Sequence, residues 1–209
     1  MRIGGLTPFT LSDFPGRTAA IIFTQGCNFR CPFCHNASLL PLSASSDDLV
    51  PEREVCRLLE SRMGRLDGVV ITGGEPTLQS DLPKFLDVIR RMGFEIKLDT
   101  NGSHPEMVHR LIARKLVDYI AMDIKAPWDS YDLLTGVETP VDRIRETMRI
   151  VTNSGIEHEF RTTVVDALLS EDDILSISAS IPVDSPHRLQ TFQPENALDP
   201  ELRQAMEVA

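Results

Sequence analysis

The chain has 209 residues, a formal net charge of −10 and a hydrophobic content of 42%. This length suits a single domain over residues 1–209, and the acidic balance argues against a protein dedicated to nucleic acid, whose contact surface would be basic. No segment reaches the roughly 20 apolar residues that span a bilayer, and the N-terminus lacks the apolar core of a secretory signal. We therefore expect a cytoplasmic protein without a membrane partner, in which cysteines stay reduced.

Short apolar runs alternate with amphipathic stretches along the chain. The runs predict strands at residues 19–24, 69–72, 94–99, 119–124, 158–165 and 189–192. Apolar stripes at helical spacing predict helices around residues 51–61, 82–89, 107–112, 144–151 and 174–178. Asp81 is a candidate cap for the second helix, and Gly155 is placed to end the fourth.

The alternation of strands and helices predicts the fold class. Six strand–helix units imply parallel strands joined by right-handed crossovers. A full eightfold barrel needs about 250 residues, so we predict an α/β fold, an open partial (β/α)6 barrel with outer helices. A doubly wound sheet is the alternative. In either fold the functional site lies at the C-terminal ends of the strands.

Distinctive glycine and polar residues do follow the predicted strands. They are Gln25–Cys27, Gly73–Pro76, Thr100–Gly102, Asp123 with Lys125, Arg161–Thr163, and Gln193–Pro194. Glycine, proline and asparagine are common in any turn, but turn geometry gives no reason for charged side chains at several strand ends. These positions therefore predict one site.

Three of the four cysteines fall in one loop. Cys27, Cys31 and Cys34 have C-x3-C-x2-C spacing, which suits a compact iron–sulfur centre with one iron left open, because electron-transfer clusters use four cysteines. The main alternative is zinc, with His35 or Cys56 as the fourth ligand. The remaining interpretation is three buried thiols without any metal.

Several segments together resemble a known family. The loop CNFRCPFCHN resembles the signature loop of the radical S-adenosylmethionine (SAM) superfamily, with Phe33 at its aromatic position, and Gly73–Pro76 resembles that superfamily's second motif. Ser12–Gly16, Leu98–Gly102 and Met122–Lys125 resemble the activating enzymes of glycyl-radical enzymes. The likeness is strongest to those acting on anaerobic ribonucleoside-triphosphate reductase, and pyruvate formate-lyase activating enzymes come next.

This resemblance implies a radical SAM oxidoreductase. Cys27, Cys31 and Cys34 would hold a 4Fe–4S cluster, and SAM would bind its open iron and be cleaved to a 5′-deoxyadenosyl radical. The implied partner is a glycyl-radical enzyme. Because the chain shows no inserted pair of further clusters, its electron would come from an external donor such as flavodoxin or ferredoxin.

The resemblance also implies roles for residues near the strand ends. The loop of Gly73, Gly74 and Glu75 would receive the methionine amino group, and Lys125 and Arg161 would bind the carboxylate. The full set of candidate cofactor contacts is Phe33, Cys34, His35, Gly73, Gly74, Glu75, Asp123, Lys125, Arg161 and Gln193. Asp99, Thr100 and Asp123 form a candidate site for a monovalent cation. Gln193 stands where pyruvate formate-lyase activators carry a histidine.

Plainer interpretations stay open for these residues. Asp99, Asp123 and Lys125 could simply form ion pairs, and Arg161 could belong to a structural salt bridge. Two other functions also stay open, a radical SAM enzyme that acts on a small molecule or peptide and a zinc-binding module without catalysis. Iron and sulfide content separates the zinc module from the other two.

Overall fold

A computed structural model describes residues 1–204 of the chain. Its centre is a seven-stranded sheet in which the strands lie in chain order, from β1 at one edge to β7 at the other. The strands are β1 (Ile3–Thr10), β2 (Ala19–Thr24), β3 (Gly68–Gly73), β4 (Glu95–Thr100), β5 (Tyr119–Asp123), β6 (Glu157–Val164) and β7 (His187–Thr191). All neighbours pair in parallel except β1 and β2.

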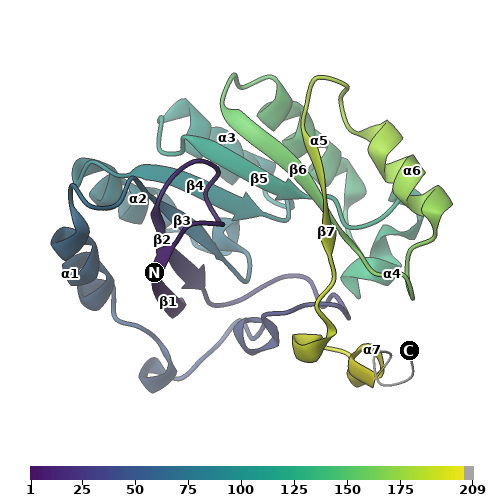
Figure 1. Cartoon of the computed structure of the whole chain (residues 1–209), viewed down its shortest axis with the longest axis horizontal. Helices are drawn as coiled ribbons and strands as arrows, with labels where there is room; N and C mark the ends of the chain where they lie inside the picture. Colours follow the sequence, from purple (N-terminus) through teal and green to yellow (C-terminus); the bar gives the residue numbers. More distant parts are fainter. Residues whose placement is uncertain (205–209) are drawn as a thin grey trace.

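Helices follow the parallel strands, and most of them cover one side of the sheet, whereas the last one, α7, lies beyond the end of β7 (Figure 1). They are α1 (Glu52–Arg62), α2 (Leu82–Arg91), α3 (Pro105–Ala113), α4 (Tyr131–Thr135), α5 (Val141–Thr152), α6 (Glu171–Ser180) and α7 (Pro200–Gln204). The curved sheet is open between β1 and β7, so the predicted α/β class and partial barrel are confirmed. No helix within residues 1–204 is both long and apolar enough to cross a bilayer.

The six predicted strands all form, with small changes in their bounds. The last one, β7, begins two residues before the predicted run at Leu189. The five predicted helices also form as α1, α2, α3, α5 and α6, and Gly155 has the positive φ expected after a helix end. Asp81 stands at the N-cap of α2, but its carboxylate makes no capping bond and instead lies 2.8 Å from the Met1 amino group.

β1 was not predicted from the sequence, because its glycine pair and proline lower strand propensity. The structure explains one of these glycines. A Cβ on Gly4 would lie 2.4 Å from the Leu39 side chain and 2.8 Å from Gln25, so this edge strand must pass close to the loop that follows β2. β1 pairs antiparallel with β2 across two register shifts.

The core has two parts. The larger lies between the sheet and its helices, and the smaller fills the inner face of the sheet. Phe14 belongs to the smaller cluster, is fully buried, and packs edge-on against Tyr119 at a ring-centroid distance of 6.0 Å. Phe14 therefore fills the barrel interior below the strand ends, which leaves the polar site above it.

Candidate active site

The loop that follows β2 and carries the three clustered cysteines is called the cysteine loop. Its first residues are hydrogen-bonded to the segment of chain that follows it. The N–H groups of Gly26 and Cys27 donate to the carbonyl oxygens of Leu39 and Leu40, at 2.7 and 3.1 Å. Further along, the Arg30 N–H donates to the Thr135 carbonyl at the end of α4, at 2.7 Å. These bonds satisfy the backbone of an irregular segment that would otherwise be costly to bury.

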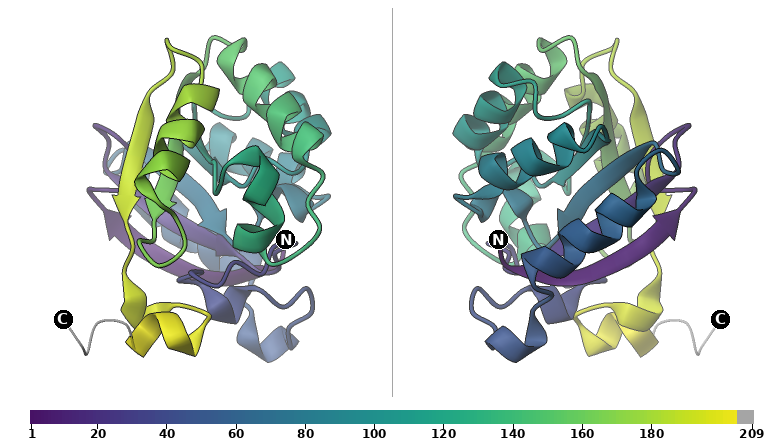
Figure 2. Two further views of the ribbon diagram at one scale, coloured as in Figure 1. Left: turned by 90° about the vertical axis from the view of Figure 1, so that its right-hand side faces the viewer. Right: turned by 90° about the vertical axis from the view of Figure 1, so that its left-hand side faces the viewer.

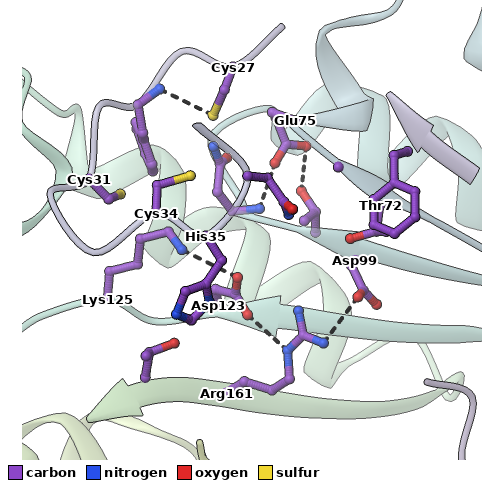
Figure 3. Close-up of a pocket in the computed structure, with 18 of the residues that line it drawn as sticks. Cys27, Cys31, Cys34, His35, Thr72, Glu75, Asp99, Asp123, Lys125 and Arg161 are labelled. Carbon is purple, nitrogen blue, oxygen red and sulfur yellow. Dashed lines mark hydrogen bonds and ion pairs between the residues drawn. The ribbon is translucent and has the colours of Figure 1, made fainter. Parts of the chain in front are cut away.

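The three clustered cysteines line one wall of a cavity of about 350 Å³ at the C-terminal ends of the strands (Figure 3). Cys27 and Cys31 are buried and Cys34 is partly exposed. Burial raises the pKa of the Cys27 thiol to about 12 and that of Cys31 to about 11. Near neutral pH these thiols are protonated until a metal replaces the proton.

The two glycines after β3 are required by backbone packing. A Cβ on Gly74 would lie 2.2 Å from the Gly26 carbonyl oxygen, and one on Gly73 would lie 2.4 Å from the Thr24 nitrogen. Gly73 also has a φ of +111°. Both residues line the cavity, but their lack of a side chain is explained by the close approach of β2 and the cysteine loop.

Glu75 joins three segments of the site. Its carboxylate is 1% exposed and accepts hydrogen bonds from the Thr77 N–H at 3.0 Å, the Thr100 hydroxyl at 2.8 Å and the Asn101 N–H at 2.7 Å. Burial raises its pKa, although the bonds from Asn101 and Thr77 act in the opposite direction. Glu75 thus anchors the turn after β3 to the end of β4.

The opposite wall of the cavity carries alternating charges. Arg161 on β6 donates from Nε to Asp123 on β5 at 2.9 Å, and from a terminal nitrogen to Asp99 on β4 at 3.1 Å. Asp123 also accepts from Lys125 at 3.3 Å, and the buried ammonium of Lys97 pairs with Asp99. The parallel register brings these groups together, because Asp123 lies directly opposite Arg161.

This arrangement keeps the charges fixed. Burial alone would raise the pKa of Asp123, but the positive charges of Arg161 and Lys125 outweigh it and lower the pKa to about 2. Burial alone would lower the pKa of Lys125, and the Asp123 carboxylate together with the nearby cysteines raises it instead. The pKa of Arg161 is raised by Asp123 and Asp99 against the effect of burial. The ion pairs of the plainer interpretation are therefore present, with Arg161 between Asp99 and Asp123 and Lys125 on Asp123.

The Arg161 side chain lies between the two carboxylates of the candidate cation site. The guanidinium of Arg161 bridges Asp99 and Asp123, and the Thr100 hydroxyl donates to Glu75. Within residues 1–204, no three His, Cys, Asp or Glu side chains come close enough to hold a single metal ion. A cation at Asp99 and Asp123 would have to displace Arg161 from one of them.

Phe33, His35 and Gln193 differ in their relation to the cavity. Phe33 is buried in the cavity wall, and the Lys125 ammonium lies over its ring, 5.8 Å from the ring centroid. His35 also lines the cavity. The Gln193 side chain is exposed and is not among the described residues that line the cavity, whereas its backbone N–H donates to His35 Nε2 at 3.2 Å.

The comparison with protein families decides where this chain belongs. A model described as the radical SAM superfamily matches residues 21–176, which include all three clustered cysteines and the Gly73–Pro76 segment. The chain belongs to the radical SAM superfamily. It is therefore an oxidoreductase of a family that works with an iron–sulfur cluster and SAM.

Two relatives extend the likeness along the chain. The chain is 32% identical over 206 residues to a predicted glycyl-radical enzyme activating enzyme of Methanocaldococcus jannaschii, covering 96% of this chain and 84% of the relative. It is 28% identical over 187 residues to the pyruvate formate-lyase-activating enzyme of Clostridium pasteurianum, covering 86% of this chain and 75% of that one.

A solved structure supports the fold. SuiB of Streptococcus suis, solved with S-adenosylmethionine, aligns with a TM-score of 0.63 and 17% identity. The alignment covers 81% of this radical SAM chain and 39% of SuiB. At this identity the likeness concerns the fold only.

The residues at the site fit the two cofactors of the superfamily. Three thiols on one wall are the soft donor set that iron–sulfur clusters use, and they leave one corner of a four-iron cluster without a cysteine. The opposite wall presents both cationic and anionic groups, which suits a ligand with an amino group, a carboxylate and a ribose. The volume also falls within the usual range of about 300–1,000 Å³ for small-molecule sites.

Six polar residues that line the cavity were not predicted as site residues: Asp13, Asn36, Thr72, Asn101, Thr163 and Gln190. Asn101 and Thr163 stand in segments already marked as strand ends. The position of Gln190 in the cavity could have been predicted from strand alternation. Its neighbour on β7, Leu189, is exposed, and successive side chains of a strand point to opposite faces. Asp13 could be found only through the Ser12–Gly16 segment, because nothing in the sequence predicts how β1 brings it to the cavity.

Proposed function

We propose that this radical SAM protein is an activase that installs a glycyl radical on a partner enzyme. The observation that carries the proposal is the 32% identity to a predicted glycyl-radical enzyme activating enzyme, which extends over 96% of this chain. Such coverage includes the segments outside the cysteine loop, where target choice would be encoded. The partner we propose is an anaerobic ribonucleoside-triphosphate reductase.

In this proposal Cys27, Cys31 and Cys34 are the ligands of a 4Fe–4S cluster. Their position on one wall supports this role, as does the fixing of their loop by Leu39, Leu40 and Thr135. Their high thiol pKa values imply that cluster insertion releases protons. A cluster held there would supply the electron for reductive cleavage of SAM, and the cleaved cofactor would supply the group that removes a hydrogen atom from glycine.

The charged wall would orient SAM. Lys125 and Arg161 can donate to its carboxylate, while Asp123 can accept from the amino group or the ribose hydroxyls. The turn of Gly73 and Gly74 offers main-chain groups to the methionine amino group, and Glu75 keeps that turn in place. Because the wall groups are already paired, they are held in position before a ligand arrives.

The open side of the sheet offers a path for a protein substrate. β1 and β7 form its two edges. Asp13, which follows β1, and Gln190, which lies on β7, line the cavity from these two sides. A loop of a partner protein could approach the cavity there without displacing any helix. The electron would come from a separate one-electron donor such as flavodoxin or ferredoxin.

The test is an anaerobic reaction of the reconstituted protein with SAM, a reductant and a co-expressed anaerobic ribonucleotide reductase. We expect 5′-deoxyadenosine in the solution and an electron-spin signal on a glycine of the reductase. A reductase with this glycine changed to alanine is the control and should give no signal. SAM cleavage without a glycine signal on the native reductase would refute this activase assignment and favour a small-molecule or peptide substrate.

A further inference from the structure

The C-terminal segment, residues 192–204, returns to the cysteine loop after β7. Figure 2 shows it in both views beside the loop that follows β2, below the ends of the strands. The segment is anchored by apolar burial, because Ala197 is fully buried and Leu202 is 7% exposed, both within the main core. It is therefore a packed part of the fold at this site.

Two backbone groups of the C-terminal segment bind the cysteine loop on either side of Cys34. The Asp199 N–H donates to the Pro32 carbonyl oxygen at 2.8 Å. The Gln193 N–H donates to the Nε2 atom of His35, at 3.2 Å. Pro32 precedes Cys34 by two residues and His35 follows it directly, so the loop is held on both sides of this cysteine.

Phe192 adds an aromatic contact to the same histidine. Its ring stacks on the His35 ring with centroids 5.5 Å apart and planes 17° apart. Phe192 is partly buried against the main core, whereas His35 is exposed. The core-anchored ring thus holds a histidine that would otherwise be free to turn into solvent.

This end of the cysteine loop needs outside support more than its beginning does. Gly26 and Cys27 are held by Leu39 and Leu40, and Cys27 is buried. Cys34 is the least buried of the three thiols, and its own N–H donates within the loop, to Cys31 at 3.0 Å. A ligand that can swing away exposes a cluster to chelators and to solvent.

We propose that Phe192 is a positioning residue, which acts through His35 to hold Cys34 in place and so retains the iron–sulfur cluster. The inference rests on the proposed function, because it takes Cys27, Cys31 and Cys34 as the cluster ligands. It assigns the C-terminal segment the task of cluster retention, separate from any contact with SAM.

The experiment measures iron release from the anaerobically reconstituted protein to a ferrous chelator, together with loss of the visible cluster absorbance. For Phe192→Ala we expect release about three- to tenfold faster, which corresponds to the loss of one aromatic pair. Phe192→Tyr keeps the ring and should release iron at the wild-type rate. Phe9→Ala is the matched control, because Phe9 is 52% exposed on β1 and lines no part of the cavity.

A second variant separates this role from general stability. His35→Ala should speed release to a similar degree, and combining it with Phe192→Ala should add little, because both remove one contact. His35 is exposed, so this variant carries the test even if Phe192→Ala does not fold. Unchanged release in His35→Ala and in a folded Phe192→Ala would overturn the inference and leave the proposed function intact. A wild-type protein that takes up no cluster would instead overturn the proposed function, and the inference with it.

Discussion

The backbone N–H of Glu75 donates to the carbonyl oxygen of Gly26 at 2.8 Å. This bond joins the turn after β3 to the first residues of the cysteine loop. The second radical SAM motif, Gly73–Pro76, is therefore bonded to the residue directly before Cys27, the first residue of the signature loop. A change in one of them should disturb the other, and the first prediction uses this coupling.

Gly74→Ala should prevent the cysteine loop from closing correctly. The added Cβ would lie 2.2 Å from the Gly26 carbonyl oxygen, and this contact is between backbone segments that cannot turn aside. We expect reduced cluster uptake, measured as iron and sulfide per chain after reconstitution. Gly5→Ala is the control, since its Cβ would make an ordinary contact of 3.5 Å with Phe23. Equal uptake in both variants would contradict the coupling.

Glu75→Gln should destabilise the protein without cofactors by about 1–3 kcal/mol, the usual cost of an unsatisfied buried group. One carboxylate oxygen accepts from Thr77 and Thr100 and the other accepts from Asn101, so an amide NH2 must face a donor in either orientation. Urea unfolding measures the effect. Glu60→Gln on the exposed side of α1 should leave the free energy of unfolding unchanged, and a similar loss there would point to a general effect of charge.

Lys125→Met should weaken SAM binding to the cluster-loaded protein by about tenfold or more, because a hydrogen bond between charged groups contributes about 1.5–3 kcal/mol. Titration calorimetry under anaerobic conditions gives the dissociation constant. Lys84→Met removes an exposed lysine from α2 and is the charge-matched control. An unchanged affinity in Lys125→Met would assign Lys125 to the ion pair with Asp123 alone.

The stability of the cofactor-free protein should fall between about pH 4 and pH 2 through Asp123. Its folded-state pKa is lowered to about 2 from an ordinary value of 3.8, so the stabilisation is present above the unfolded pKa and is lost as the pH drops toward the folded one. We expect Asp123 to account for about 1–2 kcal/mol of the free energy of unfolding that the protein loses in acid. Unfolding curves at pH 5, 4 and 3 should show a smaller loss in Asp123→Asn. An identical slope in both proteins would contradict the ion-pair geometry.

Much of the parallel sheet could be predicted from local sequence. Buried parallel strands give continuous apolar runs such as Ala19–Thr24, and amphipathic helices give regular stripes such as that of Leu82–Arg91. β1 could not be predicted, because its glycines and proline hide the strand and its pairing depends on a partner that follows in the chain. The short α4 carries too few residues for a periodic pattern.

The geometry of the site depended on contacts between distant segments. The sequence singled out Asp99, Asp123 and Arg161, but only the register of β4, β5 and β6 places the guanidinium between the two carboxylates. Gln193 was predicted as a cofactor contact from its position near the last strand. Its side chain is exposed, and its backbone contact with His35 depends on how the chain turns after β7, which no local pattern specifies.

The central claim is that Cys27, Cys31 and Cys34 hold a cluster with one iron free for SAM. The most direct measurement is the iron and sulfide content of the anaerobically reconstituted protein, together with 5′-deoxyadenosine release under dithionite. We predict a four-iron cluster and SAM cleavage in the wild type and in Cys56→Ala, and loss of cleavage when any of the other three cysteines becomes alanine. A wild-type protein that binds tetrahedral zinc and leaves SAM intact would contradict the account.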